Sequence, residues 1–312
     1  MGDRSSDRGP DTKHIYQSLY TNLVIACGKG VGAALSGSGA MLAETLHSFS
    51  DCVNQLLLLL GVKRAQKEPD EDYPLGYGRS LYFWSFMVAL LLFSGGGAFS
   101  IYEGWHKISH PEPLAGGITL SFIILIGSLV LEGKATWDNL KEMKVRRGDK
   151  PLMKYLRETK DSDLVVIFGE NGAATLGLAV AAFSLLMTVV TGDPRWDGVG
   201  SFSVGLILIG VAVFLAYEVQ SLLLGESADP VIKKGIIEIV ETHEHVQSIY
   251  QVITLQQGPG EVLLTFKLEC DSHLSFQAVV GLINELEMKI RAKHPEVKWI
   301  FIEPDTGHTE TT

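Results

Sequence analysis

The stretch MLAETLHSFSDCVNQLLLLLGV, residues 41–62, decides the fold of this chain. It is long enough to cross the hydrocarbon core of a bilayer, which takes roughly 20 apolar residues in a helix. Yet Glu44, His47 and Asp51 stand among its apolar side chains. An ionisable group at the bilayer centre costs roughly 2.5–3.5 kcal/mol even on the lenient insertion scale, so these residues call for a functional explanation.

His47 and Asp51 are four residues apart, so they share one face of the predicted helix. Asn54 extends that face toward one end and Glu44 toward the other, which makes both candidates for additional ligands or supporting contacts. Imidazole nitrogen and carboxylate oxygen suit Zn2+ and similar borderline metals. The face therefore predicts an intramembrane metal site, and the alternative is a buried polar network that joins helices without any ligand.

Five further apolar stretches accompany this one, so the sequence predicts six membrane-spanning helices in a compact bundle. Hydrophobic residues make up 46% of the 312 residues, and they are clustered in these stretches. The other five are residues 15–34, 81–102, 113–131, 164–190 and 198–217. The first is interrupted by Lys29, which either pairs with an acid or extends its ammonium group to the membrane surface.

A closed zinc site needs three or four ligands, so the pair on the second span needs partners. The fifth span contains GENGAATLG, residues 169–177, whose Gly and Ala residues allow a close approach to a neighbouring helix. Glu170 is the candidate third ligand, and Asn171 beside it is an additional one. Glu132 ends the fourth span as a candidate proton relay, unless its side chain extends to the interface near Lys134.

Lysine and arginine predict the orientation. They crowd the tail and the loops on the N-terminal side, whereas only Lys107 and Arg195 lie in the opposite loops. We therefore expect an integral, multi-pass protein of a bacterial-type inner or plasma membrane with both termini in the cytoplasm.

The texture of the sequence changes near residue 226. IKKGIIEIVE repeats apolar residues at helical spacing, IYQVITL and VLLTFKLE are typical of strands, and QQGPGE between them indicates a hairpin turn. A helix over 276–293 and a final strand, VKWIFIE, complete an α-β-β-α-β order that predicts a small α+β domain. The expected organisation is a polar cytoplasmic tail (1–13), a six-helix transmembrane domain (14–225), a cytoplasmic α+β domain (226–304) and a polar tail (305–312).

Several function classes are disfavoured by composition. A net charge of −10 argues against a nucleic-acid partner. The six apolar stretches make membrane lipid the expected surrounding. No nucleophile with a base and no phosphate-binding loop is recognisable, so we expect no enzymatic activity. His243 and His245 stand close together, but we expect them to be solvated at a helix end.

The sequence resembles the cation diffusion facilitator family, the zinc transporters, from residue 16 to 302. The resemblance is carried by SGSGAMLAETLHSFSDCVNQLLLLLGVKRA (36–65), DEDYPLGYGRSLYFWS (70–85) and GDPRWDGVGSFSVGLILIG (192–210). It implies a homodimer, formed through the transmembrane and cytoplasmic domains, that exports Zn2+ from the cytoplasm in exchange for protons by alternating access.

The chain departs from the family pattern at its accessory positions. The family usually has a second ligand pair on the fifth helix, and here those positions are Glu170 and Ala174. This indicates a divergent branch, resembling the zinc transporter nine subgroup, whose harder site also suits Mn2+, Fe2+ or Co2+. Loop and tail metal positions of the family correspond to non-ligating residues, so we expect the tail to dimerise by apolar packing. These positions are Tyr73, Tyr77, Tyr250, Lys267 and Ile302.

The sequence therefore predicts a divalent metal efflux transporter, an antiporter with protons, whose metal site is His47, Asp51 and Glu170. The alternative is a membrane-embedded metal sensor or scaffold that binds metal without transporting it.

Overall fold

The computed structural model describes residues 12–113, 118–159 and 162–306, in which the chain forms two compact units. One consists of Met1–Gly61, Trp84–Lys150 and Asp163–Tyr217, and the other of Val62–Phe83, Pro151–Ser162 and Glu218–Thr312. Most of the predicted polar tails, with the charges of Arg4 and Arg8 that entered the orientation argument, lies outside the described residues.

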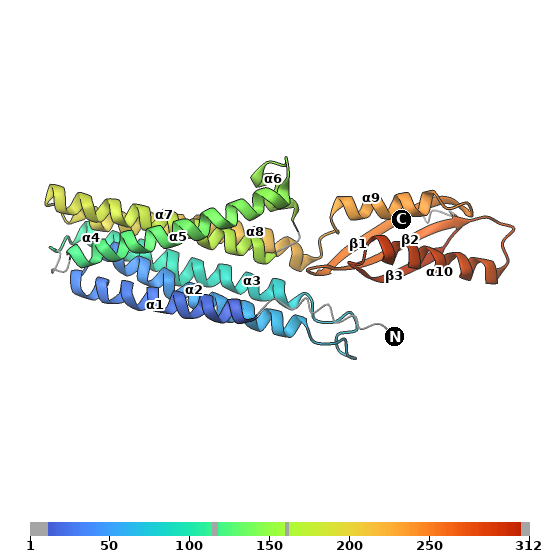
Figure 1. Ribbon diagram of the computed structural model, residues 1–312, viewed down its shortest axis with the longest axis horizontal. Coiled ribbons are helices and arrows are strands. Elements are labelled where there is room, and N and C mark those ends of the chain that lie inside the picture. The colour runs from blue at the N-terminus through green and yellow to red at the C-terminus, as the bar shows by residue number, and fades with distance from the viewer. Residues whose placement is uncertain (1–11, 114–117, 160–161, 307–312) are drawn as a thin grey trace. The chain divides into compact units, whose positions relative to one another are not determined.

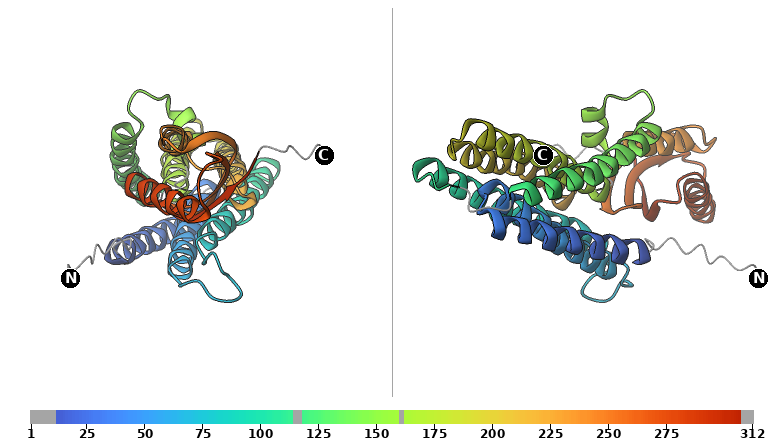
Figure 2. Two further views of the ribbon diagram at one scale, coloured as in Figure 1. Left: turned by 90° about the vertical axis from the view of Figure 1, so that its right-hand side faces the viewer. Right: turned by 60° about the vertical axis from the view of Figure 1, so that its left-hand side comes forward.

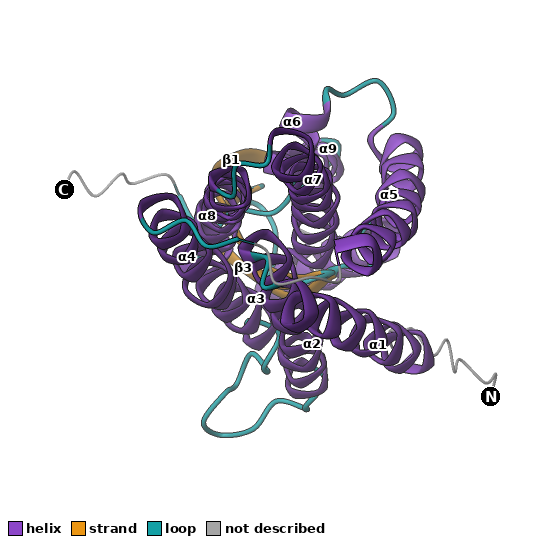
Figure 3. Cartoon of the chain, turned by 90° about the vertical axis from the view of Figure 1, so that its left-hand side faces the viewer, coloured by secondary structure: helices purple, strands orange, loops and turns teal. Residues whose placement is uncertain are grey.

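The first unit is built from six long helical segments that run alongside one another (Figure 1; two further sides in Figure 2; end-on in Figure 3). Five of them contain one predicted span each, and α5 contains the fourth span, 113–131, from residue 118 onward. They are α1 (Thr12–Ser36), α2 (Gly39–Ala65), the continuous α3, η1 and α4 (Ser80–Leu91, Leu92–Ala98 and Phe99–Ser109), α5 (Ile118–Arg147), α7 (Ser162–Thr191) and α8 (Arg195–Leu224).

Among the described residues, four of these six segments are long and apolar enough to cross a membrane: Ser80–Ser109, Ile118–Arg147, Leu164–Thr191 and Arg195–Leu224. The apolar part of α1 is shorter, Asn22–Ser36. Helix α2 is not among the four, and it contains the polar residues Glu44, His47 and Asp51. The chain is therefore an integral membrane protein by these four helices alone.

A π-helical segment, Leu92–Ala98, interrupts the helix of the third predicted span, which the sequence analysis expected to be regular. Close packing accompanies this segment. A Cβ added at Gly205 would lie 2.8 Å from the carbonyl oxygen of Gly97, and one added at Gly104 would lie 2.7 Å from that of Gly198. Because only glycine allows such contact, the backbones of η1–α4 and α8 form one tightly packed helix pair.

The start of α2 is anchored by Asp197, a buried residue near the start of α8. Its carboxylate accepts hydrogen bonds from the Ser38 hydroxyl and from the backbone N–H groups of Gly39 (2.6 Å) and Ala40 (3.3 Å). Lys107 lies 3.1 Å from the same carboxylate. A negative charge at a helix N-terminus satisfies free N–H groups and opposes the positive end of the helix dipole, so this contact fixes the beginning of the helix that carries His47.

The second unit confirms the predicted α-β-β-α-β order. Its elements are α9 (Pro230–Glu241), β1 (Val246–Gly258), β2 (Glu261–Cys270), α10 (Phe276–Lys293) and β3 (Val297–Pro304). The strands lie in the order β1-β2-β3, with β1 antiparallel and β3 parallel to β2. The hairpin is tighter than QQGPGE suggested, because only Pro259 and Gly260 separate the strands and Gly260 supplies a φ of +68°. The short helix α6 (Leu152–Glu158) was not expected.

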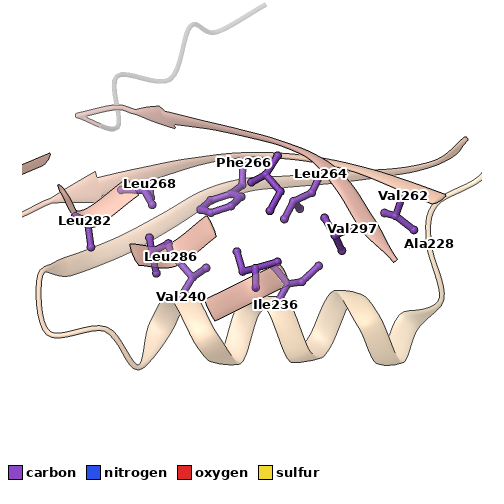
Figure 4. Packing of buried hydrophobic residues seen from close by; sticks show 12 residues of the cluster. Ala228, Ile236, Val240, Val262, Leu264, Phe266, Leu268, Leu282, Leu286 and Val297 are labelled. Atoms are coloured by element: carbon purple, nitrogen blue, oxygen red, sulfur yellow. The ribbon is translucent and has the colours of Figure 1, made fainter. Parts of the chain in front are cut away.

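Helices α9 and α10 cover one face of this sheet, and their apolar side chains meet those of the strands in a single core (Figure 4). The alternating burial of β2 produces this face, since every second side chain points to the helices. The opposite face is open: Ile253 and Phe301 are 46% and 57% exposed. The core consists of Ala228, Ile236, Val240, Val262, Leu264, Phe266, Leu268, Leu282, Leu286, Ile290, Val297 and Ile300.

Candidate metal centre

The predicted pair lies together on α2. His47 Nδ1 is 3.6 Å from Asp51 Oδ1, and the two side chains are 0% and 14% exposed. Both ring nitrogens of His47 are buried and have no hydrogen-bond partner among the described residues. The same holds for Asp51 Oδ1. Buried polar atoms are normally paired, so an imidazole and a carboxylate left open side by side are arranged to receive a ligand.

Asn54 connects this face to α7. Its Nδ2 donates a hydrogen bond of 2.6 Å to Glu170 Oε1, so the predicted partner helix packs where the sequence placed it. Ala173 and Ala174 are buried on the same helix, which allows the close approach that its small residues predicted. Glu170 is thus next to the α2 face, and a neutral amide holds its carboxylate.

Negative charge accumulates around the pair. Asp51 interacts electrostatically with Glu170 and with Glu132 of α5, and Glu132 also acts on Glu44 and Glu170. Four carboxylates that share one low-dielectric region attract cations strongly. Glu132 is half-buried, so its predicted role as a proton relay stays a prediction.

Lys29 of α1 supplies the balancing positive charge, which the sequence could not assign. Its ammonium group is fully buried and donates hydrogen bonds to Glu44 Oε2 (3.2 Å) and to Ser48 Oγ (2.8 Å). The alternative in which the lysine reaches the membrane surface is therefore wrong. Glu44 is an ion-pair partner, and its other oxygen, Oε1, accepts no hydrogen bond from the described residues.

The remaining candidate, Asn171, is half-buried, and its backbone carbonyl accepts a hydrogen bond of 2.9 Å from Thr136 Oγ1. Within the described part of the chain, no three His, Cys, Asp or Glu side chains gather closely enough to hold one ion. His47 and Asp51 are together, while Glu170 is held by Asn54 and Glu44 by Lys29. A three-ligand site thus requires Glu170 to exchange its amide partner for a metal.

The loop positions of the family pattern are occupied by a different network. Tyr77 Oη donates to Asp70 Oδ2 (2.6 Å), Lys67 Nζ donates to the same oxygen (2.6 Å), and the Tyr73 and Tyr77 rings lie 4.3 Å apart. These donors, Lys67 first, lower the pKa of Asp70 to about 2. The loop is therefore held by an ion pair, a tyrosine hydrogen bond and two rings in tilted contact.

Two of the family's metal positions in the tail, Tyr250 and Lys267, also form contacts within the domain. The Tyr250 hydroxyl donates to Glu269, which raises the pKa of Tyr250 to about 12. Lys267 forms ion pairs with Glu303 (3.1 Å) and Asp305 (3.3 Å), and these raise its pKa.

His243 contradicts the expectation of a solvated pair. It is buried, with Nε2 3.5 Å from Glu285 of α10, and its ring lies 6.0 Å from that of His245. The sequence did not indicate that His243 is buried, because α10, which packs over the end of α9, lies far along the chain.

Comparisons with known proteins identify the family of the chain. Residues 15–224 match the family model described as the cation efflux transmembrane domain. The chain is 34% identical over 271 residues to the "Proton-coupled zinc antiporter SLC30A9, mitochondrial" of Homo sapiens, covering 84% of this chain and 47% of that protein. It is 30% identical over 275 residues to "Metal tolerance protein C4" of Arabidopsis thaliana, covering 87% of this chain and 58% of that protein.

A bacterial relative matches over more of its length. "Magnetosome protein MamB" of Magnetospira sp. is 24% identical over 293 residues, which is 92% of each chain. The chain nevertheless spans about half the length of the human relative it matches.

Proposed function

Because the chain belongs to the cation efflux family, also called the cation diffusion facilitators, we propose that it transports a divalent metal cation across a membrane in exchange for protons. Zn2+ is the first candidate, since the human relative is named a proton-coupled zinc antiporter. Mn2+, Fe2+ and Co2+ stay as candidates because carboxylates outnumber imidazole around the site. The observation that carries the proposal is the buried His47–Asp51 pair with its open nitrogens and oxygen.

The proposed ligands are His47, Asp51 and Glu170. Metal entering the acidic region competes with Asn54 for the Glu170 carboxylate and wins, because a divalent charge binds a carboxylate more strongly than a neutral amide does. Asn54 Oδ1, which accepts no hydrogen bond from the described residues, is a further oxygen at the same place. Imidazole must be neutral to ligate, so a metal ion and a proton compete for His47.

The proposed topology has six crossings, with α1 and α2 joining the four helices that qualify alone. Polar residues of α2 then face the bundle interior, consistent with the complete burial of Glu44 and His47. The lysine- and arginine-rich side, with both termini, faces the cytoplasm. A bacterial-type inner or plasma membrane is the proposed location; the 34% identical human relative is named a mitochondrial protein, so a mitochondrial membrane is the alternative.

The proposed assembly is a homodimer to which the open face of the C-terminal sheet contributes. Ile253, Thr265 and Phe301 stand opposite one another across the three strands, so they form one row on that face. Exposed apolar rows of this kind mark interaction sites in soluble domains.

Transport in proteoliposomes tests the site. With an interior zinc indicator and an interior pH dye, Asp51→Ala and Glu170→Ala should each lower zinc-driven flux at least as much as the roughly 10–100-fold that losing an outer partner costs a metal site. Asp138→Ala removes an exposed carboxylate from α5 and serves as the matched control, with flux within about twofold of wild type. Wild-type flux in both site variants would contradict the assignment of Asp51 and Glu170 as metal ligands.

The same assay separates a transporter from a sensor or scaffold. A transporter moves zinc repeatedly and collapses an imposed proton gradient when zinc is added. Stoichiometric zinc binding without flux or proton movement would instead favour the sensor.

A further inference from the structure

A fully buried ammonium group lies beside the proposed ligands, although lysine cannot itself bind a metal in its charged form. Lys29 Nζ contacts Glu44 at 3.2 Å and Ser48 at 2.8 Å. These two residues are one turn apart on α2, and His47 lies between them in the sequence. Burying a lone lysine here would be prohibitive, and its pairing with Glu44 makes both charges tolerable.

Glu44 is the nearest additional anionic group to the site along α2. It precedes His47 by three residues, and side chains at this spacing are neighbours on a helix surface. A Cβ added at Gly177 of α7 would overlap Glu44 Oε1, so this carboxylate is seated between three helices. With its second oxygen unpaired, Glu44 has the chemistry of a fourth ligand.

The two acids differ in what holds them. Glu170 accepts a hydrogen bond from a neutral amide, whereas Glu44 is bound by a positive charge. Both carboxylates accept charge-assisted hydrogen bonds, but separating the buried Lys29–Glu44 pair leaves two uncompensated charges, whereas releasing Glu170 leaves only a neutral amide unpaired. Glu170 is therefore free to move to a metal, and Glu44 is not.

Resting on the proposed function, we propose that Lys29 is a positioning residue that determines metal affinity by keeping Glu44 out of the ligand set. The transported ion is then bound by His47, Asp51 and Glu170 without a fourth protein anion. Transport requires binding that is firm enough for entry and weak enough for release. Lys29 shifts that balance toward release.

The decisive single variant is Lys29→Met, which keeps the length of the side chain and removes its charge. Freed from its partner, Glu44 joins the metal. Zinc titration calorimetry on the purified full chain should show a Kd lowered on the order of 10–100-fold, the scale on which supporting residues change metal sites. In proteoliposomes the KM and kcat for zinc should fall together, because release becomes slower. Lys29→Arg retains the charge and should behave as wild type.

A double variant keeps the test decisive if Lys29→Met alone does not fold. Lys29→Met with Glu44→Gln replaces a buried ion pair by a neutral pair, a change that folded proteins commonly tolerate. Neither residue ligates metal under this proposal, so the zinc Kd of the double variant should lie within about twofold of wild type. Lys107→Met removes a half-buried lysine of α4, whose ion pair with Asp197 lies at the start of α2, and should leave the Kd equally unchanged.

The outcomes separate this inference from the proposed function. A Lys29→Met protein that binds zinc as wild type does or more weakly overturns the inference, as does a double variant whose Kd rises tenfold. The proposed function fails separately, if wild-type protein shows no zinc flux or Asp51→Ala retains it.

Discussion

At the residue scale, the centre is a balance between one buried ammonium and four nearby carboxylates. His47 and Asp51 were predictable because their spacing along α2 is local and their cost in an apolar helix is high. The partners of Lys29 and Glu170 were not, since they come from residues 15 and 116 positions away. Sequence identifies which intramembrane charges need a reason, and only packing shows which of them neutralise one another.

Ala174 offers a direct test of the reduced ligand set. It is buried four residues after Glu170, so Ala174→Asp adds a carboxylate to the same face of α7. Without metal the added charge should cost roughly 2.5–3.5 kcal/mol, and zinc should recover most of that loss by binding it. Thermal unfolding with and without zinc measures the difference. Ala182→Asp is the control, because it introduces a buried charge more than three turns along α7 from Glu170 and should gain no extra stabilisation from zinc.

Asp70 predicts an acid-dependent loop. Its pKa is lowered to about 2 by Lys67 and then Tyr77, so its contribution to folding is present above the ordinary value near 3.8 and disappears as pH falls through about 2. The stability difference between wild type and Asp70→Asn should therefore shrink between about pH 4 and pH 2. Carboxyl chemical shifts should give a higher Asp70 pKa in Tyr77→Phe, and an unchanged value would contradict the hydrogen bond.

At the scale of elements, hydropathy predicted all six long helices and the α-β-β-α-β tail. It did not predict the π segment at Leu92–Ala98, because its glycines permit several helical geometries and the packing against α8 selects one. Nor did it show that Asp197 caps α2, a contact between residues 157 to 159 positions apart. Periodicity reports the burial of each helix, whereas its ends are fixed by residues from elsewhere.

The cap on α2 should be measurable. Asp197→Ala removes the carboxylate that accepts from Ser38, Gly39 and Ala40 at the start of α2 and leaves Lys107 without this partner, so it should cost more than the roughly 0.5–2 kcal/mol of an ordinary N-cap. Asp197→Asn keeps one acceptor and should cost less. Unfolding in detergent compares them with Asp193→Ala, an exposed acid of the same turn that accepts only from the Arg195 N–H. If Asp193→Ala and Asp197→Ala lower the free energy of unfolding equally, the cap does not stabilise the protein as expected.

At the scale of the whole molecule, assembly is the property furthest from the sequence pattern. The strands of the tail alternate regularly, yet only the paired register shows that Ile253, Thr265 and Phe301 align on the uncovered face. The family's metal positions in this domain are held by internal contacts of Tyr250 and Lys267. A dimer formed here must therefore depend on apolar area and not on bound metal.

That dependence gives the final prediction. Phe301→Asp places a charge at the β3 end of the row Ile253–Thr265–Phe301, so the proposed dimer of the full-length chain should dissociate at protein concentrations where the wild type stays associated, as mass photometry in nanodiscs would record. Chelator should leave the wild-type dimer intact, because no metal joins the tails. Phe276→Asp is the matched control: this residue is 82% exposed at the start of α10, outside the open face of the sheet, and its replacement should not alter assembly. If Phe301→Asp stays dimeric while chelator dissociates the wild type, the interface is metal-dependent and lies elsewhere on the chain.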